Sequence, residues 1–152
     1  MFLERKQDLS IYYYLKDEIL IPPYDTVLVV DGYPEQDLVI PSVAVVNQTL
    51  TIEPFELGNR RGQRIRVWNI DVFAANKAQR DEISSIIING LEDIRIAVYD
   101  YDEGFPPTVS PTQLGVLIPS NIEILTIRIF PDLVEKLYWR SSIRFLTEYD
   151  EL

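Results

Sequence analysis

One helical stripe of isoleucine and leucine constrains the fold of this chain more than any other feature of its sequence. The stripe residues recur three and four positions apart, which places them on one face of an α-helix. They are Ile83, Ile86, Ile87, Gly90, Leu91 and Ile94. Asn76 is a natural N-cap, and Gln79 three residues later resembles a capping box. The sequence therefore predicts a helix over residues 76–94, with one apolar face that another layer of structure must cover.

The covering layer is predicted to be a β-sheet. Residues 137–149 alternate between apolar and polar side chains, which is typical of a strand with one buried face. Further strands are predicted at 26–30, 42–47, 49–53, 63–75, 95–101, 114–118 and 122–130. In strand 63–75 apolar residues occur at both odd and even positions. Either both faces of this strand are partly covered, or a bulge near Val67 changes which positions face the core. We expect the core to combine the helical stripe with Trp68, Ile70, Trp139, Ile143 and Phe145.

A first helix is predicted at residues 8–20, with Asp8 as its N-cap and Pro22-Pro23 after its end. A short helical turn is predicted at 131–136, opened by Pro131. The predicted fold is α+β, a mostly antiparallel sheet with two main helices packed on one face, formed as a single domain over residues 1–152.

Composition excludes several classes of chemistry. The 152 residues include no cysteine and no histidine, which removes disulfides, thiolate metal sites and imidazole general bases. No GxGxxG or GxxxxGK[ST] motif occurs. The charge is −10, from 24 acidic and 14 basic residues, which disfavours specific binding to nucleic acid. No apolar run approaches the roughly 20 residues that span a bilayer, and the N-terminus lacks the apolar region of a signal peptide. We expect a cytosolic protein with no cofactor, no metal and no enzymatic activity.

The stretch VYDYDEGFPP, residues 98–107, contains the carboxylates of Asp100, Asp102 and Glu103. These oxygens are ligands that Ca²⁺ or Mg²⁺ accepts in proteins. Their spacing does not continue into an EF-hand, and Gly104 with Pro106-Pro107 is typical of a turn. We favour a strand that ends in a rigid turn over a metal site.

The stretch NRRGQRIR, residues 59–66, is the strongest charge asymmetry in the chain. It contains Arg60, Arg61, Arg64 and Arg66, four of only 14 basic residues. They could form bidentate pairs with an acidic patch on a neighbouring subunit, or they could form a solvated hairpin tip, and the sequence does not separate these two interpretations. Phosphate binding ranks below both, because the rest of the chain repels a polyanion.

Residues 52–107 carry a resemblance to a known class of proteins. A strand reads W-x-I-D-V-F-A at 68–74, N-K-x-Q-R-D-E follows at 76–82, and Y-D-Y occurs at 99–101. A P-x-V-x-V segment at 41–45 fits the same pattern. These motifs resemble the head–tail connector and tail-terminator proteins of tailed bacteriophages, which are also called tail completion or neck proteins.

This resemblance implies a structural virion protein, assembled in the host cytoplasm. Such subunits form a ring, usually a hexamer, that caps the tail tube and joins it to the head. The implied partners are further copies, the tail tube protein and connector or stopper proteins. Genomic DNA passes through the lumen without specific binding, and no membrane is involved.

The charges are compatible with such a ring. A ring needs contacts between two different patches of adjacent copies. We predict that one patch is formed by Arg60, Arg61, Arg64 and Arg66 and the other by acidic residues that include Asp100, Asp102 and Glu103. An excess of carboxylates also keeps a lumen from binding phosphate.

Other functions stay open at this point. The protein could be a stopper or minor tail protein, or an acidic adaptor or DNA mimic that acts without forming a ring. A carboxylate-dependent metal enzyme would need Asp100, Asp102 and Glu103 to converge with another acid, such as Asp31 or Asp71.

Overall fold

The computed structural model describes residues 2–32, 39–54, 62–126 and 139–152. The elements follow one another in the order α1 (Leu3–Tyr14), a π-helical turn η1 (Leu15–Ile19), β1 (Leu28–Asp31), β2 (Ser42–Pro54), β3 (Gly62–Ala74), α2 (Lys77–Leu91), β4 (Ile96–Tyr99), β5 (Gln113–Thr126) and β6 (Trp139–Glu151). The predicted turn at 131–136 lies outside the described residues.

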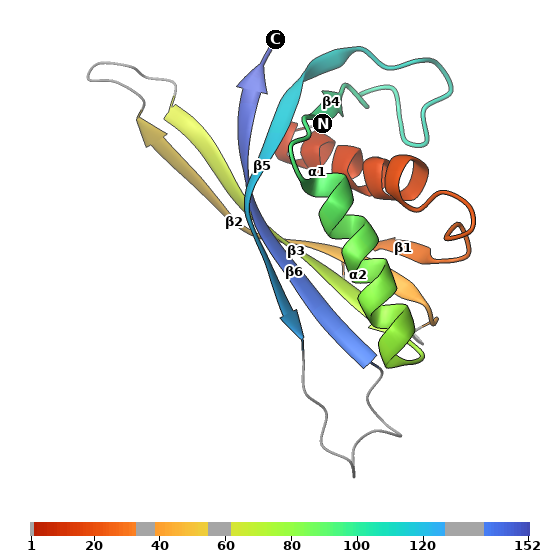
Figure 1. The fold of residues 1–152 in the computed structure, drawn as a ribbon. Coiled ribbons are helices and arrows are strands. Elements are labelled where there is room, and N and C mark those ends of the chain that lie inside the picture. The colour runs from red at the N-terminus through yellow and green to blue at the C-terminus, as the bar shows by residue number, and fades with distance from the viewer. Residues whose placement is uncertain (1, 33–38, 55–61, 127–138) are drawn as a thin grey trace.

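The strands form one six-stranded sheet in the order β1-β2-β3-β6-β5-β4. Only β1 and β2 are parallel, and the other neighbours in this sheet are antiparallel. Both α1 and α2 lie on the same face of the sheet (Figure 1). The predicted α+β fold, with a mostly antiparallel sheet and two main helices on one face, is confirmed.

Two pairs of predicted strands are in fact single long strands. The segments predicted at 42–47 and 49–53 are both part of β2, whose pairing with β3 shifts register between Asn47 and Thr49. The segments predicted at 114–118 and 122–130 contribute to β5, whose pairing with β6 is irregular between Ser120 and Glu123. A register shift reverses which residues face the core, so a bulged strand reads in sequence as two short strands.

Along β3, every second residue faces the core without interruption. The register shift near Val67 comes from an extra residue in its partner strand β2. Trp68, Ile70 and Val72 face the core and are fully buried. Arg66 occupies the next core-facing position and is also buried, with 1% of its surface exposed. The mixed pattern in the sequence therefore comes from an arginine at a position where an apolar residue is expected.

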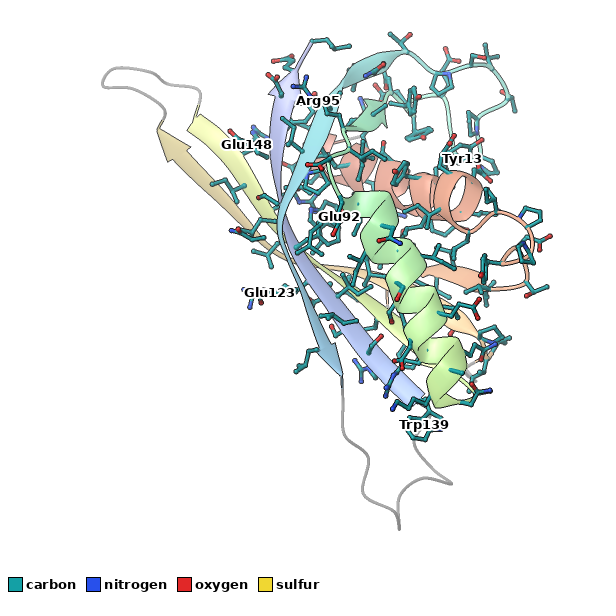
Figure 2. The ribbon with its side chains drawn as sticks, viewed as in Figure 1. Tyr13, Glu92, Arg95, Glu123, Trp139 and Glu148 are labelled. Atoms are coloured by element: carbon teal, nitrogen blue, oxygen red, sulfur yellow. The ribbon has the colours of Figure 1, made fainter. Side chains whose placement is uncertain are left out.

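The α2 stripe packs on the sheet largely as predicted. Ile83, Ile87 and Leu91 are buried with Trp68, Ile70, Ile143 and Phe145 in one apolar cluster. Ile86 is partly buried and packs against this cluster, whereas the prediction was wrong for Trp139, which is partly buried outside it. Trp139 lies at the start of β6, beside the first turns of α2, where the Arg80 guanidinium lies 5.4 Å from its ring centre (Figure 2).

The two ends of α2 follow from local chemistry. The Asn76 side-chain oxygen accepts a hydrogen bond from the Gln79 N–H at 2.8 Å, which confirms the predicted N-cap. The Gln79 side chain accepts from the Ala75 N–H at 2.8 Å, one residue before the cap. Near the C-terminal end, the Tyr14 hydroxyl of α1 donates to the Gly90 carbonyl at 2.7 Å and joins the two helices.

The predicted N-cap of α1 was wrong. The helix begins at Leu3, its N-cap is Phe2, and the Phe2 side chain makes no capping hydrogen bond. Asp8 lies inside this helix, and its carboxylate accepts a hydrogen bond from Arg66 at 2.8 Å instead of capping a helix end. A distant partner on β3, which local sequence does not reveal, thus determines the role of this residue.

Candidate functional site

The residues predicted to form an interface do not meet one another in the described part of the chain. Arg60 and Arg61 lie outside the described residues. Arg64 and Arg66 of β3 contact one side of α1, while Asp100 and Asp102 after β4 contact Lys6 of the same helix. Helix α1 therefore separates the two predicted patches and forms ion pairs with each.

Arg66 is the most deeply buried charge in this region. Its guanidinium donates to the Gln7 side-chain oxygen at 2.8 Å, to the Glu4 carbonyl at 3.0 Å and to the Asp8 carboxylate at 2.8 Å. The guanidinium carbon also lies 4.2 Å from the centre of the Trp68 ring. This set of contacts satisfies most of the planar donor group and leaves Arg66 no exposed surface for a second subunit.

Burial governs the charge of the partner carboxylate. Removal from water raises the pKa of Asp8, and the adjacent Arg66 guanidinium only partly opposes that effect. Burial of the Asp8 carboxylate thus opposes its ionisation more strongly than the Arg66 guanidinium favours it. Buried ion pairs of this kind orient elements more than they stabilise them.

Two further ion pairs hold the N-terminal turns of α1 to the sheet. Arg64 donates to the Glu4 carboxylate at 2.9 Å, and both side chains are more than one-third exposed. Arg5 pairs with Asp31 at the end of β1. The prediction grouped Arg64 and Arg66 with Arg60 and Arg61, but the structure gives the first two partners inside the subunit.

The acidic loop is tied to α1 by a lysine. The Lys6 ammonium lies 3.0 Å from an oxygen of Asp100 and 3.0 Å from an oxygen of Asp102. These hydrogen bonds, first the one with Asp100, raise the pKa of Lys6 against the opposing effect of its burial. Asp100 also accepts from the backbone N–H of Asp102 at 3.1 Å, which closes a local turn. Lys6 thus supplies the positive charge that a metal would otherwise bring.

Aromatic packing fixes the same loop. The Phe105 ring meets the Tyr101 ring edge-on at 5.1 Å, and it meets Tyr12 and Tyr13 of α1 in the same manner at 5.7 and 6.2 Å. A hollow of about 300 Å³ lies over the loop, and Glu103 is among its lining residues. These contacts favour the structural interpretation of VYDYDEGFPP over a metal site.

The acids named for a metal enzyme do not converge. Asp31 is engaged by Arg5, and Asp71 accepts a hydrogen bond from Arg140 at 2.8 Å on the helix-free face of the sheet. Within residues 2–32, 39–54, 62–126 and 139–152, no group of three acidic, histidine or cysteine side chains is placed to hold a metal ion.

The helix-free face of the sheet carries both charge and apolar surface. Figure 2 shows Glu123 of β5 and Glu148 of β6 on this side, away from both helices. Glu123 lies opposite Arg144 across the β5–β6 pair, and Arg140 lies over the Phe73 ring at 5.2 Å. Neither helix covers this face in the described part of the chain, and Arg144 on it is exposed, but Asp71 on the same face is buried within the chain.

Two stretches of strand have an unpaired edge among the described residues. Strand β1 pairs with β2 only from Ser42 to Val45, so Val46–Pro54 pairs with β3 alone. Strand β6 joins β3 only from Ile65 onward, so the outer end of the β2–β3 hairpin projects past the rest of the sheet (Figure 1). On the other side, β4 covers β5 only as far as Leu117.

No protein-family model matches the chain, and no curated protein sequence matches it.

None of the helices within the described residues has the length and apolar character that crossing a membrane requires.

Sequence reasoning missed the residues of α1 that organise this region. Glu4, Lys6 and Gln7 precede the helix predicted at 8–20, and each is a polar residue with no motif around it. Their importance comes from partners 59 or more positions away in the sequence, such as Arg66 for Gln7. The one available signal was the charged residue at a core-facing position of strand 63–75, which implies that a buried partner exists.

Proposed function

We propose that this chain is a structural virion protein of a tailed phage, a tail-terminator or neck subunit rather than an enzyme. Copies form a ring, a hexamer by the resemblance described above, at the top of the tail tube. The ring joins tail to head in the virion after assembly in the host cytoplasm, and DNA passes through it.

The observation that carries this proposal is the projecting β2–β3 hairpin. Beyond the Ile65–Glu148 pair, the outer ends of β2 and β3 are paired in the sheet only with each other among the described residues. An isolated two-stranded hairpin is marginally stable in water. A second molecule that covers this hairpin gives it the packing that the single subunit does not provide.

Charge supports the same proposal. With a net charge of −10, each subunit repels DNA, which suits a conduit through which DNA must move. Because Arg64 and Arg66 form ion pairs inside the subunit, we assign the contact with a neighbouring copy to Arg60 and Arg61, which lie between β2 and β3 in the sequence. Exposed pairs of this kind contribute about 0–1 kcal/mol each, so they set partner choice more than affinity.

The test is the double variant Arg60→Glu with Arg61→Glu, introduced into a phage whose genome encodes the chain. A matched control makes the same charge change at two exposed positions elsewhere, Lys77→Glu with Arg95→Glu. We expect unjoined heads and tails, or tails of irregular length, from the first variant in electron micrographs, and normal particles from the control.

Two results would contradict the proposal at different levels. Normal infectious particles from the Arg60 and Arg61 variant would remove these arginines from the assembly contact. Purified virions whose necks and tails contain no copy of the chain by peptide mass spectrometry would refute the virion role itself.

A further inference from the structure

We infer that neighbouring copies join edge to edge, with β2 of one copy hydrogen-bonded to β5 of the next, so that the sheet continues from subunit to subunit. This inference rests on the proposed ring and names the surface by which its copies associate. It uses the two unpaired strand edges described above.

The first edge is the outer part of β2. From Val46 to Pro54 this strand has no neighbour on its β1 side among the described residues. Its outward backbone N–H and C=O groups are a template for another strand. Proline, which natural proteins use to block such edges, occurs only at the end of this stretch, at Pro54.

The second edge is the distal part of β5. Strand β4 ends its pairing at Leu117, and Pro119 with the irregularity at Ser120–Glu123 interrupts the edge directly after it. Beyond the interruption, Ile122–Thr126 again runs beside β6 with its other edge unpaired in the described part of the chain. Ile124 and Leu125 there are 49% and 66% exposed, although both are large apolar residues. Successive strand residues face opposite sides, so this end is apolar and uncovered on both faces.

The positions of the two edges identify a second copy as the occupant. In the order β1-β2-β3-β6-β5-β4, the central strands β3 and β6 are paired on both sides, and the two free edges belong to opposite flanks of one sheet. A contact between β2 of one copy and β5 of another therefore uses a different surface on each partner. In a row of copies joined in this way, the first and the last copy each keep one free edge. Contacts of this head-to-tail type propagate from copy to copy, and they close into a ring when the rotation between neighbours divides a full turn evenly.

Main-chain pairing also suits a subunit of this charge. Ten excess negative charges on each copy oppose association through side chains. Hydrogen bonds between backbone groups carry no net charge, and burial of Ile124 and Leu125 adds apolar contact. The edge contact can therefore form despite the repulsion between subunits.

The chain has no native cysteine, so engineered disulfides report this contact without background. Thr49→Cys or Thr51→Cys is combined in one chain with Glu123→Cys or Leu125→Cys, giving four double variants. A control pairs Thr51→Cys with Lys77→Cys at the start of α2. The proteins are oxidised both in concentrated solution and in purified virions, and separated under denaturing, non-reducing conditions.

We expect a ladder of covalent oligomers from at least one edge variant, ending at the ring size, and none from the control. Mixing the separate single variants Thr51→Cys and Leu125→Cys should give dimers, whereas Leu125→Cys alone should stay monomeric. Dimers from Leu125→Cys alone would indicate a two-fold contact and overturn the inference.

The inference and the proposed function fail in different ways. Intact rings or virions that contain the protein, with no cross-link in any of the four edge variants, would refute the edge contact alone. A ladder of covalent oligomers from the edge variants of a protein that is absent from virions would refute the virion role alone. A protein that stays monomeric in concentrated solution and is absent from virions would refute both.

Discussion

At the residue scale, the contact between α1 and the sheet depends on Arg66. This arginine is 1% exposed, stacks on Trp68 and donates to three oxygens of α1. Removing one member of a buried ion pair leaves the other charge in an environment of low polarity, without its partner. The Arg66 side chain is therefore expected to matter far more for stability than its neighbour two residues earlier.

We predict that Arg66→Met lowers the free energy of unfolding by about 3–5 kcal/mol at neutral pH. Arg64→Met is the matched control, because the Arg64–Glu4 pair is more than one-third exposed on both sides and should contribute only about 0–1 kcal/mol. Urea unfolding followed by tryptophan fluorescence measures both. Equal losses of unfolding free energy in the two variants would show that the buried Arg66 contributes no more to stability than the exposed Arg64.

The cost of Arg66→Met should also depend on pH. Burial already raises the pKa of Asp8 above 3.8, and Arg66 is the main group that lowers it. Without the arginine that pKa rises further, so Asp8 in the variant takes up a proton more readily when folded than when unfolded. Stability contributed by a raised pKa is present below the unfolded value and is lost as pH rises through the folded value. The loss caused by Arg66→Met should therefore be smaller at about pH 5 than at about pH 8.

At the element scale, α2 packs against the π-helical turn η1 through a position without a side chain. A Cβ added at Gly90 would lie 2.7 Å from the Ile19 Cδ1 atom, and Ile19 is itself 6% exposed. Glycine inside a helix ordinarily costs about 1 kcal/mol relative to alanine. The close approach of Ile19 explains why glycine is nevertheless present here.

We predict that Gly90→Ala destabilises the protein by about 1–2 kcal/mol, because overpacking outweighs the gain in helix propensity. In an Ile19→Ala background the same change should become neutral or stabilising, since the crowding atoms are gone. A thermodynamic cycle from the four urea unfolding curves measures this coupling. Additive effects of the two substitutions would contradict the packing argument.

The elements also show which parts of the fold the sequence determines locally. The Asn76 cap and the Ile83–Ile87–Leu91 stripe were predicted correctly, because a cap and a helical face depend on residues a few positions apart. The start of α1 was not, because Asp8 lies inside a helix that begins at Leu3, and its carboxylate is bound by Arg66, 58 positions away. Strands β2 and β5 were each divided in two, because a shift in register changes the parity of burial within one strand.

The candidate site was less predictable than the fold. The sequence identified the charged stretches correctly as unusual, but it did not indicate their partners. Asp100 and Asp102 are joined to Lys6 near the start of the chain, about a hundred residues from either. Unpaired strand edges cannot be read from composition at all, because they depend on how far each neighbouring strand extends.

At the scale of the whole molecule, assembly of the proposed ring should respond weakly to salt. If arginine pairs dominated the subunit contact, raising the ionic strength would dissociate the ring through screening. Backbone pairing and burial of Ile124 and Leu125 are far less sensitive, and screening also relieves repulsion between subunits of charge −10.

We therefore predict that the oligomer persists, or strengthens, between about 0.05 and 0.5 M NaCl. Sedimentation velocity on the same protein preparation in both buffers measures the distribution of species. Loss of the oligomer at the higher salt concentration would show that charge pairs carry most of the affinity.

The place of β6 in the sheet has a consequence for biosynthesis. The strand is last in the sequence, yet it lies at the centre of the sheet between β3 and β5. The sheet therefore cannot close until residues up to Glu151 have emerged from the ribosome, and pairing of such distant segments is intrinsically slow. Until then β5 lacks its partner β6, and the β4–β5 pair is not connected to the strands β1, β2 and β3. Nascent chains should therefore complete this sheet only after translation has passed Glu151.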